Sequence, residues 1–255
     1  MSETNDNLKK LQEMGFNLDI NNTSPASAPT TSATEIPPSS SVNTENAIKT
    51  PDVPVNPVLS EALTPFTIEF VATLFPSVSR RNIEKYLMTI LSAFQTIGLT
   101  DKKLVLLAIA TIRAESVRFE PISEYKSKYN TSPNGRPFDL YDNRADLGNQ
   151  GAPDGERFKG RGFIQLTGRA NYQKYGDILK LETALIDNPD LANDPMIAAE
   201  LLARFILDKE TRIRRALENN DLKSARRAIN GGSHGLKEFS EAYLKGLAIL
   251  EGQAV

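Results

Sequence analysis

The sequence predicts one mainly α-helical domain preceded by a disordered N-terminal tail, and three observations support this fold class. From Thr64 onward, apolar residues recur at helical spacing almost throughout. A chain of 255 residues with 40% hydrophobic residues can bury one full core. Between about Asn21 and Ser60, however, Ser, Thr, Pro and Asn dominate, and this segment offers too little apolar surface to offset the entropy of ordering.

We predict that the tail covers residues 1–60 and that the folded domain covers residues 61–255. Apolar residues such as Leu8 and Leu11 allow a short amphipathic helix over residues 7–18, which would dock onto a protein partner. An untethered terminus with incidental apolar residues is the favoured alternative.

The second of the first two predicted helices of the domain ends at a carboxylate residue, Glu115. Ser79 can cap a helix that Gly98 ends. Thr100 can cap the next helix, and Glu115 stands at its carboxyl end. The negative end of the helix dipole and apolar residues beyond it, such as Phe119, would both disfavour ionisation of Glu115. We therefore expect Glu115 to keep a proton available near neutral pH.

The middle of the domain is predicted to be a long loop. Over residues 126–159 the helical periodicity is lost and Gly, Pro, Asn and Asp are frequent, which favours a cleft-lining loop with a short hairpin. A helix then begins at Thr167 or Gly168, and a long helix begins at Asp194 with Pro195 in its first turn. Two further helices complete the chain.

Composition excludes several classes of function. The chain has no Cys and a single His, so neither a thiolate site nor a His-based metal cluster can form, and we expect no metal and no cofactor. A net charge of −2 argues against nucleic acid as the main ligand. The longest apolar run, residues 104–110, is too short to span a bilayer.

Glu115 and Glu124 are a candidate pair of catalytic carboxylates. Inverting hydrolysis of a glycosidic bond uses one protonated carboxyl and one carboxylate that activates water, roughly 6.5–9.5 Å apart. The bend at Pro121 would let the two residues lie across a groove. Considered singly, each is more simply a solvated loop carboxylate. Glu120 is expected to face solvent or to pair with Arg118.

The stretch from Phe158 to Tyr172 is predicted to form the floor of a binding cleft. Glycines on either side of Arg161 let the backbone approach a ligand closely. Polar contacts to the ligand are available from Arg161, Gln165, Thr167 and Asn171. Arg161 is equally suited to brace the acidic loop through ion pairs.

Four motifs occur in one order along the chain: Ala114-Glu115-Ser116 followed by Glu124, Lys159 to Tyr172, Asn188 to Pro195, and Ile229 to Gly235. Together they resemble the glycoside hydrolase family 19 chitinases and their phage endolysin relatives. The similarity extends from about Ser77 to the carboxyl terminus. It implies a lysozyme-like, two-lobed helical domain with a sugar groove and an inverting mechanism.

The resemblance also implies roles for single residues. Glu115 matches the general acid and Glu124 the general base, while the Thr167 hydroxyl matches a group that helps to hold the attacking water. The residues that match groove positions or the aromatic of the same motif are Gln165, Asn171, Tyr172 and Asn230.

These inferences lead to one main hypothesis and one alternative. The main hypothesis is an inverting glycoside hydrolase for β-1,4 bonds next to N-acetylglucosamine, in peptidoglycan or chitin, with peptidoglycan slightly favoured. Since the first residues lack the basic and apolar regions of a signal peptide, we expect synthesis in the cytoplasm and action on a cell wall after lysis or dedicated delivery. The alternative is a non-catalytic sugar-binding or structural component of a larger assembly. Retention of both Glu115 and Glu124 argues against it.

Overall fold

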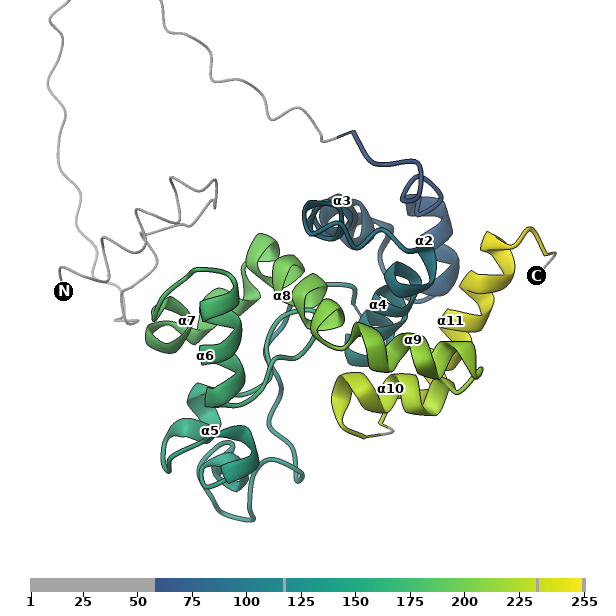
Figure 1. Cartoon of the computed structure of the whole chain (residues 1–255). Coiled ribbons are helices and arrows are strands. Elements are labelled where there is room, and N and C mark those ends of the chain that lie inside the picture. The colour runs from purple at the N-terminus through teal and green to yellow at the C-terminus, as the bar shows by residue number, and fades with distance from the viewer. Residues whose placement is uncertain (1–57, 117, 233, 254–255) are drawn as a thin grey trace, which may run out of the picture. The chain divides into compact units, whose positions relative to one another are not determined.

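The computed structural model describes residues 58–116, 118–232 and 234–253. Within these ranges the chain is mainly helical and forms no β-strand, which confirms the predicted fold class (Figure 1). The nearest approach to a sheet in the same ranges is an isolated antiparallel bridge between Arg161 and Leu166.

The start of the folded body lies close to the predicted boundary. Nearly all of the predicted tail, with the short helix over residues 7–18, lies outside the described residues. Leu59 packs against the core, and the Ser60 amide donates a hydrogen bond to the Gln95 side chain at 2.7 Å. Contacts with the body are therefore already present at residues 59 and 60, inside the predicted tail.

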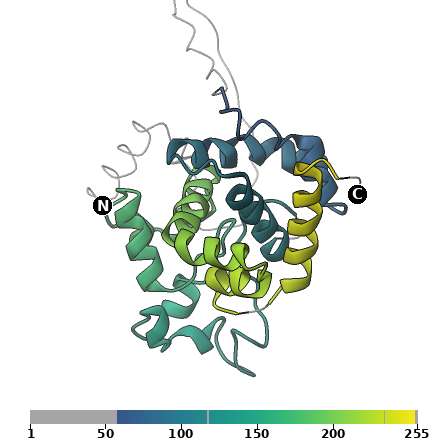
Figure 2. The ribbon, with the colours of Figure 1, turned by 45° about the vertical axis from the view of Figure 1, so that its right-hand side comes forward.

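The central helix of the body is α4, which spans Lys102–Glu115. Every residue from Leu104 to Ile112 is fully buried. A helix that is apolar on all sides needs partners on all sides. Figure 2 shows one of them, the yellow C-terminal helix, beside α4. The helices that pack against α4 are α2 (Ile68–Leu74), α8 (Pro195–Asp208) and α11 (Leu236–Leu250).

The helix ends agree with the predictions in part. Helix α3 (Arg80–Thr96) follows Ser79 as predicted, but the Ser79 side chain makes no capping hydrogen bond. Asp101, not Thr100, caps α4, because its carboxylate accepts hydrogen bonds from the amides of Lys103 and Leu104 at 2.9 and 3.1 Å. A carboxylate at this end also interacts favourably with the helix dipole.

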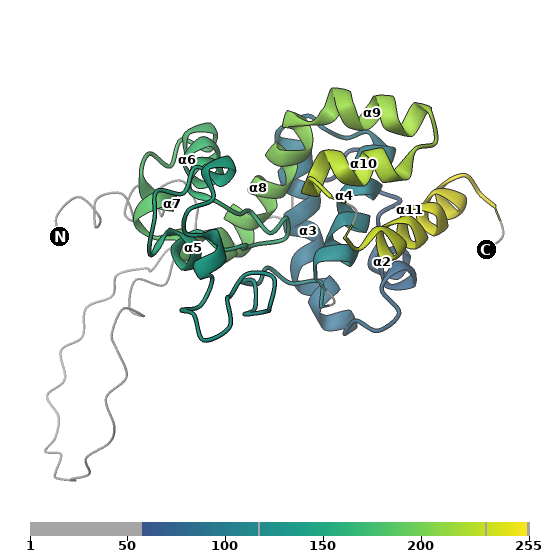
Figure 3. The same ribbon diagram turned by 90° about the horizontal axis from the view of Figure 1, so that it is seen from below.

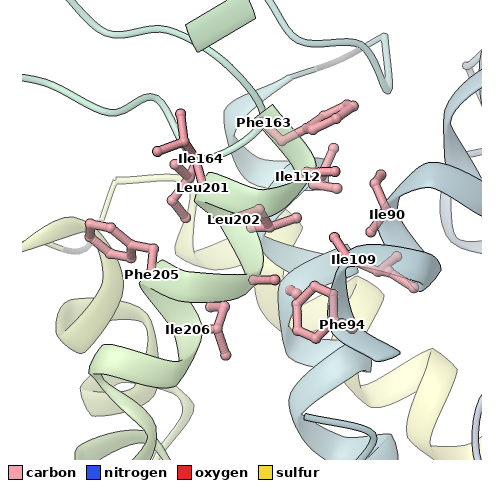
Figure 4. Close-up of a cluster of buried hydrophobic side chains, with 14 of the residues drawn as sticks. Ile90, Phe94, Ile109, Ile112, Phe163, Ile164, Leu201, Leu202, Phe205 and Ile206 are labelled. Carbon is pink, nitrogen blue, oxygen red and sulfur yellow. The ribbon is translucent and has the colours of Figure 1, made fainter. Parts of the chain in front are cut away.

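Helix α8 begins at Asp194 and Pro195, as predicted. The Asp194 carboxylate accepts hydrogen bonds from the next two free amides of the first turn, at 3.0 and 3.1 Å. Figure 4 shows side chains of α8 gathered with those of α3 and α4 into one apolar cluster, which Phe163 and Ile164 join from a loop. This cluster supports the loop that carries the predicted cleft floor.

The remaining helices form two groups on opposite sides of α8 (Figures 1 and 3). One group comprises α5 (Asp154–Arg157), α6 (Arg169–Ile178) and α7 (Ala184–Asp187). The other comprises α9 (Glu210–Glu218), α10 (Leu222–Asn230) and α11. This arrangement agrees with the two-lobed fold that the resemblance implies.

The loop predicted over residues 126–159 contains no hairpin, so that part of the prediction is wrong. Short helical turns take its place: η1 (Asp139–Tyr141), η2 (Ala145–Leu147) and α5. The segment holds its shape through side-chain to backbone bonds, such as the Thr131 hydroxyl accepting from the Phe138 amide at 3.0 Å. Polar residues that bond to nearby backbone favour turns over strand ladders.

Candidate active site

One open groove, with a cavity volume of about 710 Å³, contains both candidate carboxylates. It collects side chains from α4, α6, α8 and α10, from the short turns η1 and η2, and from loop residues between the helices. Six of the predicted site residues line it: Glu115, Glu124, Gln165, Thr167, Asn171 and Asn230. Tertiary folding therefore gathers most of the predicted site into a single hollow.

Glu115 is the last residue of α4 and is held by a buried arginine. The Arg226 guanidinium donates from Nη2 to Glu115 Oε1 at 2.6 Å, and the Arg226 side chain is 0% exposed while that of Glu115 is 17% exposed. Nε of Arg226 donates to the His234 carbonyl at 3.0 Å. This ion pair joins the carboxyl end of α4 to α10.

Glu124 accepts hydrogen bonds on both carboxylate oxygens. Oε1 accepts from the Tyr141 hydroxyl at 2.9 Å and from Asn130 Nδ2 at 3.0 Å, and Oε2 accepts from the Gly160 amide at 3.2 Å. The Glu124 amide in turn donates to the Gly160 carbonyl at 2.7 Å. Donors from three segments thus determine the orientation of this carboxylate.

Gly160 permits this close approach. A Cβ at this position would lie 2.9 Å from Gln165 Oε1, 3.2 Å from Thr167 Oγ1 and 3.3 Å from Glu124 Cβ. Any larger residue would have to push these side chains apart. The same distances place the Thr167 hydroxyl and Glu124 on one small area of the groove.

Tyr141 is suited to remain a hydrogen-bond donor. Burial raises the pKa of its hydroxyl well above the usual value, and the negative charge of Glu124 adds to the effect. The hydroxyl therefore stays protonated at every pH at which the fold is expected to be stable, and it can donate to Glu124 throughout.

Gln165, Thr167 and Asn171 stabilise the groove as well as lining it. Gln165 Nε2 donates to the carbonyls of Ile122 and Gly162 at 2.8 and 3.1 Å, which joins the Glu124 segment to the groove floor. The Thr167 hydroxyl donates to the Gln165 carbonyl at 2.9 Å, and Asn171 Nδ2 donates to the Thr167 carbonyl at 2.8 Å. These bonds leave the side-chain oxygens of Gln165 and Asn171 as acceptors for a ligand.

Asn230 lies at the carboxyl end of α10, where the chain reverses direction. Gly231 follows it with φ +73°, in the left-handed region that ends many helices. Asn230 Oδ1 accepts from the Gly232 amide at 3.0 Å, and Nδ2 donates to the His234 carbonyl at 3.3 Å. Asn230 is therefore part of a helix end and also lines the groove, as predicted.

Comparisons with known proteins are consistent with the family resemblance of the four sequence motifs. No protein-family model matches the chain. A glycosyl hydrolase family 19 domain-containing protein of Haemophilus influenzae is 28% identical over 116 residues, which are 46% of this chain and 54% of that protein. The predicted resemblance to glycoside hydrolase family 19 is confirmed. The chain spans about half the length of this curated relative.

Solved structures of a chitinase are also similar to the chain. Chitinase C from Streptomyces griseus HUT6037 has a TM-score of 0.48 and 20% identity, covering 74% of this chain and 77% of the chitinase. A mutant of chitinase C has the same TM-score and coverage with 21% identity.

Two residues that were predicted to bind substrate, Arg161 and Tyr172, do not line the groove. Arg161 is 5% exposed, and its guanidinium donates to Asp190 at 2.8 Å, to Tyr172 at 3.0 Å and to two backbone carbonyls. Tyr172 is 0% exposed and donates to the Lys159 carbonyl at 2.8 Å. Their polar atoms bond to the protein, so we correct the prediction: both brace the loop beneath the groove, as the ion-pair alternative for Arg161 proposed.

Several groove residues and their partners were missed in the sequence. Arg226, Asn130 and Tyr141 belong to none of the four motifs. Only Arg226 had a signal in the sequence, because it shares a helix face with the buried Ala225 and Ile229. The groove residues that lie outside the four motifs are Tyr125, Ser127, Tyr129, Tyr141, Leu147 and Phe205.

In the part of the chain that the structure describes, no group of three or more His, Cys, Asp or Glu residues could hold a metal ion. None of the described helices combines the length and the apolar character that crossing a bilayer requires.

Proposed function

We propose that this protein is an inverting glycoside hydrolase that cleaves β-1,4 bonds next to N-acetylglucosamine in peptidoglycan or chitin. The observation that carries the proposal is that a single groove holds Glu115 and Glu124 in different surroundings. Glu115 has one charged partner at a helix end, whereas Glu124 accepts three hydrogen bonds. Two carboxyls in distinct environments suit an acid and a base.

The proposed reaction moves two protons. Glu115 donates its proton to the glycosidic oxygen as that bond breaks, and a water attacks the anomeric carbon from the opposite face. Glu124 accepts the proton that this water loses. Arg226 stabilises the carboxylate that remains on Glu115, which favours donation in the transition state. We assign to the Thr167 hydroxyl the role of helping Glu124 hold the water, because both residues approach Gly160 closely.

The proposal is tested by incubating the full chain with chitin oligomers and with peptidoglycan sacculi and measuring the reducing ends released from each. We expect release from at least one substrate above the level of the Glu115→Gln/Glu124→Gln double variant. Equal values for the two proteins would contradict the proposal. Retained sugar binding without release would instead support the non-catalytic alternative.

The stereochemistry of the product distinguishes a base from a nucleophile. We expect the first product from a β-linked N-acetylglucosamine oligomer to be the α-anomer, because water attacks from the face opposite the leaving group. Proton NMR of the reducing ends in the first minutes, before mutarotation, measures this. An initial β-product would mean retention, by a covalent or a substrate-assisted route.

Removal of the Tyr141 hydroxyl is expected to slow the reaction without unfolding the domain. Tyr141→Phe deletes one of two donors to Glu124 Oε1 and keeps the ring. A hydrogen bond to a charged group contributes about 1.5–3 kcal/mol, so kcat should fall about 10- to 100-fold. Steady-state kinetics measure the change, with Tyr125→Phe as the control for loss of a groove hydroxyl that makes no bond to Glu124. A Tyr141→Phe rate equal to that of the control would remove Tyr141 from the mechanism.

A further inference from the structure

A second hollow, of about 550 Å³, adjoins the groove. Ser127 lines both, so the two hollows lie next to each other at this residue. The second hollow is formed by one loop, and its lining residues are Lys126, Ser127, Lys128, Thr131, Ser132, Pro133 and Asn134. It contains two lysines and no carboxylate.

The lysines and the groove aromatics alternate along the chain. Tyr125, Ser127 and Tyr129 line the groove, whereas Lys126 and Lys128 line the second hollow. The segment ends in a turn over residues 128–130, which the amides of Asn130 and Thr131 close by donating to the Ser127 carbonyl at 3.3 and 3.0 Å. The five-residue segment therefore presents an aromatic side to the groove and a cationic side to the hollow beside it.

The exposed tyrosines provide surfaces for a sugar ring. Tyr125 and Tyr129 are 70% and 77% exposed, although large aromatic side chains are usually buried. The Lys128 ammonium lies 5.1 Å from the centroid of the Tyr129 ring. A ligand that stacks on this ring would thus lie near a positive charge.

The two lysines have no anionic partner in the described part of the chain. Neither Lys126 nor Lys128 forms an ion pair there, and the nearby carboxylates are occupied elsewhere. Asp139 accepts hydrogen bonds from the Ser132 amide and hydroxyl, and Glu124 accepts from its own three donors. A hollow lined by positive charges without nearby free carboxylates attracts an anionic group.

We propose that this hollow receives a carboxylate carried by the glycan and that the substrate is therefore peptidoglycan. The inference rests on the proposed function and narrows it. Peptidoglycan carries a lactyl ether, with a peptide bearing carboxylates, on every second sugar, whereas chitin carries no acidic group. A sugar stacked on the tyrosines would place such a substituent beside Lys126 and Lys128, and the lysines would select the acidic polymer.

The test compares Lys126→Gln/Lys128→Gln with the unchanged full chain on two substrates. Release of reducing ends from peptidoglycan should fall roughly three- to tenfold, the range expected when two exposed charge contacts are lost. Release from neutral chitin oligomers should change less than twofold, so the ratio of the two rates shifts. The control is Lys102→Gln/Lys103→Gln, which removes the same charge from exposed lysines at the other end of α4, about 20 Å from Glu115 at 1.5 Å per residue.

A binding measurement distinguishes failure of this inference from failure of the proposed function. Co-sedimentation with sacculi is measured before and after their carboxyl groups are converted to neutral amides. The unchanged chain should bind the acidic sacculi several-fold more tightly, and Lys126→Gln/Lys128→Gln should lose that preference, whether or not the chain has catalytic activity. An unchanged preference in this variant, an equal loss in the Lys102→Gln/Lys103→Gln control, or hydrolysis of chitin alone would overturn the inference. If the unchanged chain preferred acidic sacculi, and the Lys126→Gln/Lys128→Gln variant lost this preference, but no substrate were hydrolysed, only the proposed function would be overturned.

Discussion

Glu115→Gln is expected to abolish most of the turnover while leaving the domain folded. The amide keeps the size of the carboxyl, and its oxygen can still accept the Arg226 hydrogen bond, but no transferable proton remains. General acid catalysis contributes ~10²–10⁴-fold, so kcat should fall by at least that range. Initial rates of reducing-end release measure the loss, and sedimentation with the substrate measures retained binding.

Glu120→Gln is the matched control for this substitution. Glu120 lies in the next segment of chain, its side chain is 25% exposed and its nearest cation is Arg118 at 3.7 Å. It is absent from the groove lining, so its amide variant should keep near-normal kcat. If folded Glu115→Gln also kept near-normal turnover, Glu115 would have no part in the mechanism and the proposed acid would have to be sought elsewhere in the groove.

Arg226→Met is expected to cause the largest loss of stability. Its guanidinium is fully buried and joins α10 to Glu115 of α4 and to the His234 carbonyl. Removing one partner of a buried ion pair costs ~3–5 kcal/mol because the other charge is left unpaired. Glu115 reaches water through the groove, so we expect the lower end, about 3 kcal/mol. For a domain of this size, that corresponds to about 6–12 °C in Tm.

A double-mutant cycle isolates the ion pair from the other contacts of Arg226. Thermal unfolding is compared for Arg226→Met, Glu115→Gln and the variant with both changes. Because the double variant leaves no unpaired charge, its loss of stability should be smaller than the sum of the two single losses. Strict additivity would show that Arg226 stabilises the domain through packing and the His234 carbonyl, and not through Glu115.

The sequence predicted much of the local structure around the site. The α4 helix ends at Glu115, and α8 begins at Asp194 and Pro195, as expected. Helix ends depend on side chains within one turn, so they can be recognised from a few neighbouring residues. The predicted cap of α4, Thr100, was wrong by one residue, because the Asp101 side chain caps the helix.

By itself, the sequence determined a Cys-free, mainly helical domain and six residues that line one groove. The tertiary structure alone decided which groups touch those residues. Arg226 is 111 positions from Glu115, and Tyr141 is 17 positions from Glu124. Tertiary packing also directs the Arg161 side chain into the protein interior. Hydrophobic periodicity and helix caps depend only on residues that are close in the sequence. The partner of a buried charge depends on how whole helices pack together, so no local sequence pattern predicts it.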